Sequence, residues 1–224
     1  MLNFLILAEP RSGTHLLKGL IGQHPELYCA GELFDPDAIH SKHYNVRRRI
    51  MEEAWRPGFK CGAIAHVTNG DFNHTDLSQH RWASMWRPDG LPGSVDKVIV
   101  LQRRDRFARL ISEQTAVRRG KWQHKLGDKV EDIEPFEIDI AAARKRFRHL
   151  AELWIQKLEL FKHLPRLNVT YEALTTAGDW ELSRVFSFLG VPLCLPAPTE
   201  LKVGKPPEKQ ITNYDEFVQK CARL

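Results

Sequence analysis

The sequence predicts an α/β fold in which a central parallel sheet is covered by helices on both faces, and three observations lead to this prediction. Apolar runs of strand length recur along the chain, at 2–8, 58–68, 97–102 and 166–174. Segments with apolar residues at helical spacing separate these runs, as the crossovers between parallel strands require. No linker divides the chain, whose 224 residues suit one sizeable core, so we expect a single domain over 1–224.

The first strand and the predicted helices follow from their apolar patterns. Residues 2–8 are apolar at almost every position, which is typical of a central strand buried on both faces. Apolar residues at helical spacing then predict helices, which we place at 14–23, 106–120, 138–163 and 179–190. Gly190 and Pro192 form a typical stop signal at the end of the last helix.

The remaining segments carry weaker structural signals. Residues 23–37 are rich in turn residues, whereas the basic stretch 41–57 is predicted to be helical. Residues 69–96 are expected to form a surface excursion with a short helix, and residues 195–224 a polar C-terminal tail. The sequence has no internal repeat. The fold class is therefore predicted from the order of strands and helices alone.

Composition narrows the class of protein. Lys and Arg number 33 against 28 Asp and Glu, a formal charge of +5, which favours anionic ligands but is too weak to indicate a nucleic-acid partner by itself. The four cysteines show neither CxxC pairing nor zinc spacing, so we expect reduced thiols and no metal in a cytoplasmic protein. No run is long and apolar enough for membrane insertion, and the first apolar stretch lacks the basic flank of a signal peptide.

The turn between the first strand and the first helix has the composition of an anion site. The first N–H groups of a helix and its dipole attract phosphate or sulfate. Gly13 has no Cβ, so the backbone can approach an anion closely, while Arg11 adds a positive charge. Ser12 and Thr14 add hydroxyl donors. The alternative is an ordinary strand-to-helix turn with a threonine N-cap.

Comparison with the Walker A pattern limits the chemistry of this P-loop-like turn. With Gly13 at the second glycine of that pattern, Thr14 replaces the lysine and His15 replaces the Ser/Thr. The lysine that contacts the nucleotide triphosphate and the hydroxyl that binds magnesium are therefore missing from their places. The turn suits a phosphate, but it argues against a metal-dependent ATPase or kinase.

A second anion site is predicted at the third of these strands. Arg103 and Arg104 lie at its end, and Ser112 follows eight residues after Arg104, about two turns into the next helix. A strand-end arginine and a helix-borne serine could hold a second phosphate, separate from the first. Two anion sites on one sheet fit a nucleotide that bears phosphate at both ends.

These motifs resemble those of sulfotransferases that use 3′-phosphoadenosine 5′-phosphosulfate (PAPS), and in particular bacterial carbohydrate sulfotransferases. PRSGTHLL is similar to their 5′-phosphosulfate loop and RRDRFARLIS to their 3′-phosphate motif. GQHPELYCAGELF resembles the segment after the first helix, and VTYEAL with VFSFLGVP resembles the late strand and helix. GKPPEKQITNYDEF resembles the nodulation-factor and lipopolysaccharide type, and TAVRRGKW the trehalose type. The resemblance spans nearly the whole chain, in order.

The resemblance implies which residues hold the nucleotide. Its 5′ side would lie on the loop and its 3′-phosphate on the second motif, with Tyr171 near the nucleotide. The loop and motif residues are Arg11, Ser12, Gly13, Thr14, His15, Arg104 and Ser112. In the C-terminal tail, Lys205 is one of three lysines that could close over the 3′-phosphate. Arg11 would also be catalytic, because it would stabilise the charge that grows on the leaving 5′-phosphate without a metal. Lys205 is equally consistent with a solvated basic segment.

Transfer to a hydroxyl needs a base, and the resemblance implies Glu32 as the first candidate, since the same segment of bacterial members carries a glutamate proposed for this task. The alternative for Glu32 is an exposed turn residue. His66 is the second candidate, although Lys60 lies six residues before it rather than at the two-residue spacing of cytosolic animal members. His66 is alternatively a structural or acceptor-binding histidine.

The resemblance thus predicts sulfuryl transfer from PAPS to a hydroxyl of a carbohydrate or glycolipid, with no nucleic acid as partner. Trp82, Trp86 and Trp122 are candidates for stacking on sugar rings. Some relatives of this type are dimers, so a homodimer is an open expectation. Two other functions remain open at this point, namely a metal-dependent P-loop kinase and a non-catalytic module that binds a nucleotide or nucleic acid.

Overall fold

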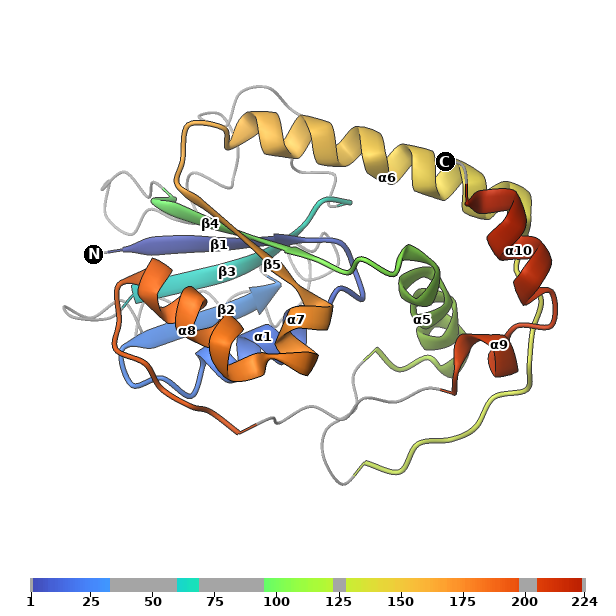
Figure 1. Ribbon diagram of the computed structural model, residues 1–224, viewed down its shortest axis with the longest axis horizontal. Helices are drawn as coiled ribbons and strands as arrows, with labels where there is room; N and C mark the ends of the chain where they lie inside the picture. Colours follow the sequence, from blue (N-terminus) through green and yellow to red (C-terminus); the bar gives the residue numbers. More distant parts are fainter. Residues whose placement is uncertain (1, 33–59, 69–94, 123–127, 198–204, 223–224) are drawn as a thin grey trace, which may run out of the picture.

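The computed structural model describes residues 2–32, 60–68, 95–122, 128–197 and 205–222. Within these ranges the sheet has five strands, all paired in parallel, in the order β2-β3-β1-β4-β5 (Figure 1). They are β1 (Asn3–Ala8), β2 (Leu27–Glu32), β3 (Lys60–His66), β4 (Lys97–Gln102) and β5 (Arg166–Thr170). The predicted parallel sheet is confirmed, and every residue of β1 is buried at its centre.

Several segments differ from their predicted structure or lie outside the described residues. The turn-rich segment 23–37 contains the strand β2, which the sequence did not predict. The strand expected at 166–174 ends at Thr170, where the helix α7 (Tyr171–Thr176) begins. The predicted helix at 41–57 lies outside the described residues, as do Trp82, Trp86 and all of the excursion at 69–96 except its last two residues, which lead into β4.

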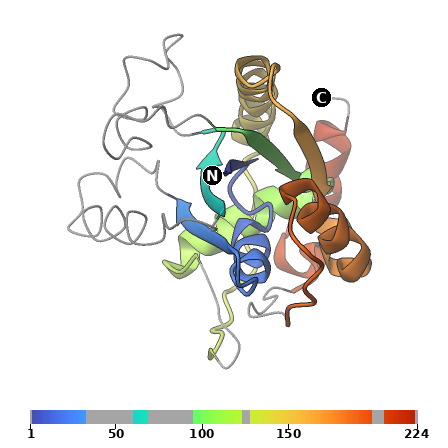
Figure 2. The same cartoon turned by 90° about the vertical axis from the view of Figure 1, so that its left-hand side faces the viewer.

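Helices cover both faces of the sheet, as predicted. Helices α1 (Thr14–Ile21), α7 and α8 (Gly178–Leu189) pack on one face and bury its larger apolar cluster. The carboxyl half of α6 (Ile140–Leu160) packs on the other face through Leu150, Leu153 and Trp154. Figure 2 looks roughly along the strands and shows α6 on one side of the sheet, with α1 and α8 on the other.

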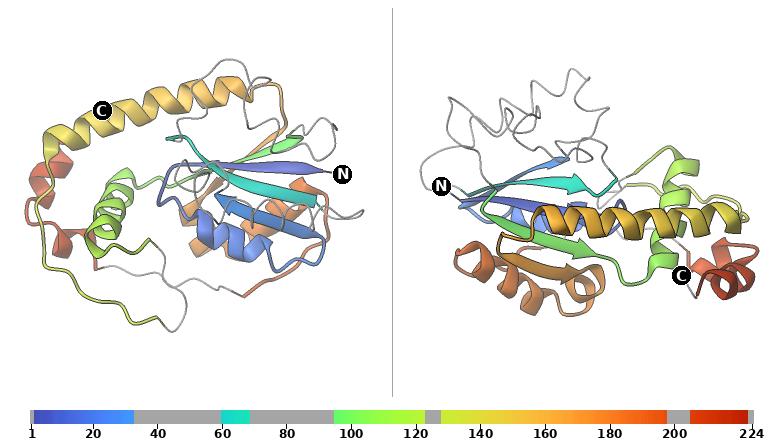
Figure 3. Two further views of the ribbon diagram at one scale, coloured as in Figure 1. Left: turned by 180° about the vertical axis from the view of Figure 1, so that it is seen from behind. Right: turned by 90° about the horizontal axis from the view of Figure 1, so that it is seen from above.

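A third cluster lies beyond the carboxyl edge of the sheet, which α6 overhangs (Figure 3). Here α5 (Arg106–Arg119), the amino half of α6 and α10 (Tyr214–Cys221) enclose Phe107, Phe147 and Phe217, whose rings contact one another. The short helix α9 (Pro207–Gln210) precedes α10. The segment 195–224 is therefore not simply a polar tail, because Phe217 is fully buried in this cluster.

Two further sequence expectations can be compared with the described residues. All four cysteines are free thiols, and three of them are buried. Burial raises the pKa of both Cys29 and Cys61 to about 11, so these thiols are poor nucleophiles near neutral pH. No helix of the described segments is long and apolar enough to cross a membrane.

Candidate active site

The fold places the candidate residues at the carboxyl end of β1. Strands β3 and β4 flank β1, with Ala8 paired to His66 on one side and to Leu101 on the other. The chain visits β2 and β3 on one side of β1 before it crosses to β4 and β5 on the other. Ligands of open α/β sheets bind outside the carboxyl ends at such a reversal of strand order.

The loop between β1 and α1 has the backbone of an anion site. Arg11 and Gly13 both have left-handed conformations, with φ of 67° and 91°. Gly13 is the N-cap of α1 and no side chain caps the helix, so a capping role for Thr14 is wrong. The hydroxyl of Ser12 is fully buried and makes no hydrogen bond to any described residue. These donors fit a phosphate or sulfate group.

Tyr171 closes one side of this loop. A Cβ added at Gly13 would lie 2.6 Å from Cδ2 of Tyr171, so the ring occupies the space that any larger residue would need. Tyr171 reaches this position because β5 ends at Thr170, whose side chain caps α7 by accepting a hydrogen bond from the N–H of Ala173. The loop and Tyr171, which the sequence places far apart, are thus in direct contact.

Arg11 extends from the loop to α5. Its Nε donates to Oγ of Ser112 at 3.0 Å, and its Nη1 donates to the carbonyl of Trp122. Burial lowers the pKa of Arg11, and the charge of Arg103 lowers it further, against the opposing influence of Glu113, Tyr171 and Glu32. The structure therefore brings residues of both predicted anion motifs together.

The two candidate bases, Glu32 and His66, meet His15 of the loop. Oε1 of Glu32 lies 3.2 Å from Nε2 of His15 and 3.4 Å from Nε2 of His66. These side chains come from the end of β2, the start of α1 and the end of β3. Glu32 is not an exposed turn residue, because its side chain is only 25% exposed.

An irregularity in β2 directs Glu32 toward these histidines. Cys29 pairs with Gly62 and Glu32 with Ile64, so β2 contains one residue more than β3 over this interval. Gly31 within the bulge has a φ of 87°, which suits glycine far better than other residues. Bulges of this kind change the direction of a side chain at the end of a strand.

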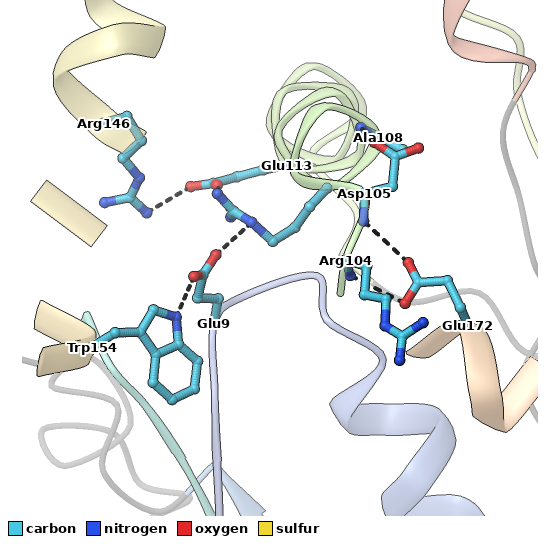
Figure 4. A network of polar contacts seen from close by, with 9 residues as sticks. Glu9, Arg104, Asp105, Ala108, Glu113, Arg146, Trp154 and Glu172 are labelled. Carbon is cyan, nitrogen blue, oxygen red and sulfur yellow. Dashed lines mark hydrogen bonds and ion pairs between the residues drawn. The ribbon is translucent and has the colours of Figure 1, made fainter. Parts of the chain in front are cut away.

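The second predicted anion motif is anchored through its backbone. The N–H groups of Arg104 and Asp105 donate to the carboxylate of Glu172, at 3.1 and 3.3 Å (Figure 4). Burial raises the pKa of Glu172, but these hydrogen bonds, another from its own N–H and the charge of Arg103 outweigh that effect and lower it. The side chain of Arg104 is exposed at this junction.

A buried ionic network holds the base of the loop, and sequence reasoning did not find it. Arg109 on α5 is almost completely buried, and its Nε lies 2.5 Å from Oε2 of Glu9, the first residue after β1. Glu9 also accepts a hydrogen bond from Nε1 of Trp154, while Glu113 pairs with both Arg109 and Arg146 (Figure 4). In the sequence Arg109 is one of four arginines on a helix rich in polar residues, so nothing local singles it out.

Two lysines lie apart from these contacts. Lys205, expected near the 3′-phosphate, instead pairs with Asp132 at 3.2 Å, and both side chains are largely exposed. Lys60 is at the opposite end of β3 from His66, where it donates to the carbonyl of Gly190 at 2.5 Å. No group of three or more His, Cys, Asp or Glu side chains among the described residues could hold a metal ion.

The chain is similar to proteins of a known family. The family model of the sulfotransferase domain matches residues 3–216. The chain is 24% identical over 223 residues to Nodulation protein H of Rhizobium meliloti (strain 1021), with 96% of this chain and 89% of that protein covered. It is also 24% identical to Nodulation protein H of Rhizobium tropici over 205 residues, covering 84% and 76% respectively.

A solved structure supports the same assignment at the level of the fold. The crystal structure of a sulfotransferase from Alicyclobacillus acidocaldarius aligns over 100% of this chain and 94% of its own, with a TM-score of 0.54 and 15% sequence identity. The kinase and the non-catalytic module considered above are therefore set aside. With a domain match over nearly its whole length, the chain belongs to the sulfotransferase-domain family and is a sulfotransferase.

Proposed function

We propose that the chain moves the sulfuryl group of PAPS to a hydroxyl of a carbohydrate or glycolipid, with Glu32 as the base. The observation that carries this proposal is the position of the Glu32 carboxylate, beside the anion loop and between His15 and His66. The carbohydrate class rests on the resemblance of residues 204–217 to nodulation-factor and lipopolysaccharide sulfotransferases.

The loop residues would hold the 5′ side of the donor. Ser12 has a buried hydroxyl without a partner among the described residues, and the first N–H groups of α1 have no side-chain cap. Gly13 leaves the backbone accessible on the side that Tyr171 does not cover, while Arg11 supplies a positive charge. Thr14 and His15 complete this set by resemblance, and Arg104 with Ser112 would take the 3′-phosphate.

Sulfuryl transfer is a single displacement at sulfur. The acceptor oxygen forms a new bond to sulfur, the bond from sulfur to the bridging oxygen breaks, and the 5′-phosphate leaves with one more negative charge. Catalysis of such a step is mainly positioning and stabilisation of that growing charge. Arg11 and the loop N–H groups would perform this task, which does not require a metal.

The proton of the acceptor hydroxyl goes to Glu32. Two imidazole nitrogens flank the carboxylate at 3.2 and 3.4 Å and restrict its orientation, which a general base needs in order to meet the hydroxyl. His66 is the more enclosed of the two histidines, with 12% of its side chain exposed against 30% for His15. His66 therefore acts as a positioning residue for Glu32, and His15 links Glu32 to the loop.

A transfer assay tests this function. The protein is incubated with PAPS labelled in the sulfate, a chelator and a panel of oligosaccharides and glycolipids, and labelled products are separated by chromatography. We expect transfer to a hydroxyl of at least one acceptor, loss of transfer in Glu32→Gln, and partial activity in Glu32→Asp. Equal transfer by the wild type and Glu32→Gln would contradict the role of Glu32.

A further inference from the structure

We propose that Arg103, to which the sequence motifs assign no phosphate of its own, is a second guanidinium of the loop site and binds the 5′-phosphate together with Arg11. The proposal rests on the proposed function for the identity of the nucleotide, and it adds a binding residue to that site. It also assigns different phosphates to two adjacent residues, with Arg103 on the 5′ side and Arg104 on the 3′ side.

The first observation is the contact through Tyr171. The guanidinium of Arg103 lies 4.8 Å from the centroid of the Tyr171 ring. The same ring lies against Gly13, the N-cap of α1. Arg103 is therefore held next to the anion loop, although it comes from the end of β4. A guanidinium stacked on an aromatic ring keeps a fixed plane with its N–H groups directed outward.

The second observation is the unmatched charge of the two arginines. Arg11 donates to the uncharged Oγ of Ser112 and carbonyl of Trp122. The Nε of Arg103 is buried without a hydrogen-bond partner, and no ion pair of Arg103 is found among the described residues. The two cations are close enough for Arg103 to disfavour the charge on Arg11. Partly buried cations that repel each other are costly unless an anion joins them.

The nearby carboxylates already have other partners. Glu172 feels the charge of Arg103, but its oxygens accept the N–H groups of Arg104 and Asp105. Glu113 pairs with Arg109 and Arg146. Among the described residues, therefore, neither guanidinium is paired with a carboxylate, and both charges are open to an anionic ligand.

The chemistry of the ligand follows from the two charges. Guanidinium groups bind phosphate oxygens in a bidentate manner, and two of them match a doubly charged phosphate monoester. The leaving 5′-phosphate of the proposed reaction has this charge after the sulfuryl group has gone. Arg104 is exposed and makes its contact to Glu172 through the backbone, so its side chain remains available for the 3′-phosphate.

Calorimetric titrations with two isomers of one nucleotide test the assignment. Adenosine 5′-phosphate and adenosine 3′-phosphate are titrated into the wild type, Arg103→Ala and Arg104→Ala, with 3′-phosphoadenosine 5′-phosphate as reference. We expect Arg103→Ala to weaken binding of the 5′-phosphate about tenfold to one-hundredfold and to leave the 3′-phosphate within about twofold. Arg104→Ala should show the opposite pattern.

Three controls keep the result specific. Arg148→Ala removes an exposed arginine of α6 and should leave both affinities unchanged. Arg103→Lys keeps the charge but not the planar stack, and should bind the 5′-phosphate more strongly than Arg103→Ala. Thermal unfolding of each variant shows whether it is folded, and Arg103→Gln replaces Arg103→Ala if the latter is not.

The outcomes separate this inference from the proposed function. Unchanged binding of the 5′-phosphate by folded Arg103→Ala and Arg103→Gln, or equal losses for both isomers, overturns the assignment of Arg103. The proposed function then still stands if the wild type prefers 3′-phosphoadenosine 5′-phosphate to both isomers. Failure of that preference in the wild type counts against the proposed nucleotide itself.

Discussion

The Nε2 atoms of His15 and His66 both approach the same carboxylate oxygen of Glu32, at 3.2 and 3.4 Å. The three side chains come from the end of β2, the start of α1 and the end of β3, and they meet next to the anion loop. Contacts from two other elements thus place Glu32 beside that loop.

The first prediction concerns Glu32 as the base. Glu32→Gln keeps the shape of the side chain but cannot take a proton, so the rate of transfer in a single turnover should fall by about 10²- to 10⁴-fold. Binding of 3′-phosphoadenosine 5′-phosphate should change little, since the nucleotide site is intact. A loss of nucleotide affinity that accounts for the whole loss of rate would show that Glu32 acts in donor binding instead.

The second prediction concerns the space at Gly13. Gly13→Ala would place a methyl group 2.6 Å from the ring of Tyr171, at a φ of 91° that disfavours any side chain. We expect strong loss of nucleotide binding and a lower melting temperature. Gly120→Ala is a matched control, because its φ is 64° but no atom of the described residues lies within 4 Å of its added Cβ. Gly120→Ala should therefore lose only the free energy of backbone strain, about 1–2 kcal/mol. Equal melting temperatures and affinities in the two variants would contradict the role of the Tyr171 contact.

The third prediction concerns acid stability. The pKa of Glu172 is lowered in the folded chain, so its contribution to stability is fully present above its unfolded pKa of about 4.3. That contribution is lost as the pH falls through the lowered folded value. Glu172→Gln should therefore be less stable than the wild type at pH 7, and the difference in free energy of unfolding should shrink below pH 4. Urea unfolding across this range measures it, and a difference that grows on acidification would exclude the proposed cause.

The fourth prediction concerns the network at the base of the loop. Arg109→Ala leaves the carboxylates of Glu9 and Glu113 without their buried partner, and should lower the free energy of unfolding by about 3–5 kcal/mol. Lys220→Ala breaks an exposed pair with Glu216 and should cost at most about 1 kcal/mol. Chemical denaturation compares the two variants. Similar small losses in both would show that the network does not hold the loop.

The sequence allowed the centre of this fold to be predicted because its signals are local. The run at 2–8, the glycine after Arg11 and Ser12, and the spacing from Arg104 to Ser112 are all visible within a few residues. The buried strand β1, the loop and helix α5 follow from them. Glu32 and His66 were found through the family resemblance, whereas their contact required the structure.

The missed features depend on contacts between distant segments. Strand β2 lies at the sheet edge, contains a glycine bulge and is surrounded by turn residues, so local composition favours a loop. The pairing of Glu9 with Arg109 and the stacking of Arg103 on Tyr171 join residues 100 and 68 positions apart. No pattern within either segment specifies its partner, which is why Arg103 was predicted only as a neighbour of Arg104.

The most direct test of the account is a metal-free calorimetric titration with 3′-phosphoadenosine 5′-phosphate, run beside AMP and ATP. The account predicts micromolar binding that requires the 3′-phosphate and that Arg11→Ala and Arg104→Ala each weaken at least tenfold, an effect expected of hydrogen bonds between charged groups. Binding no tighter than that of AMP, or binding that requires magnesium and ATP, would contradict the proposed donor.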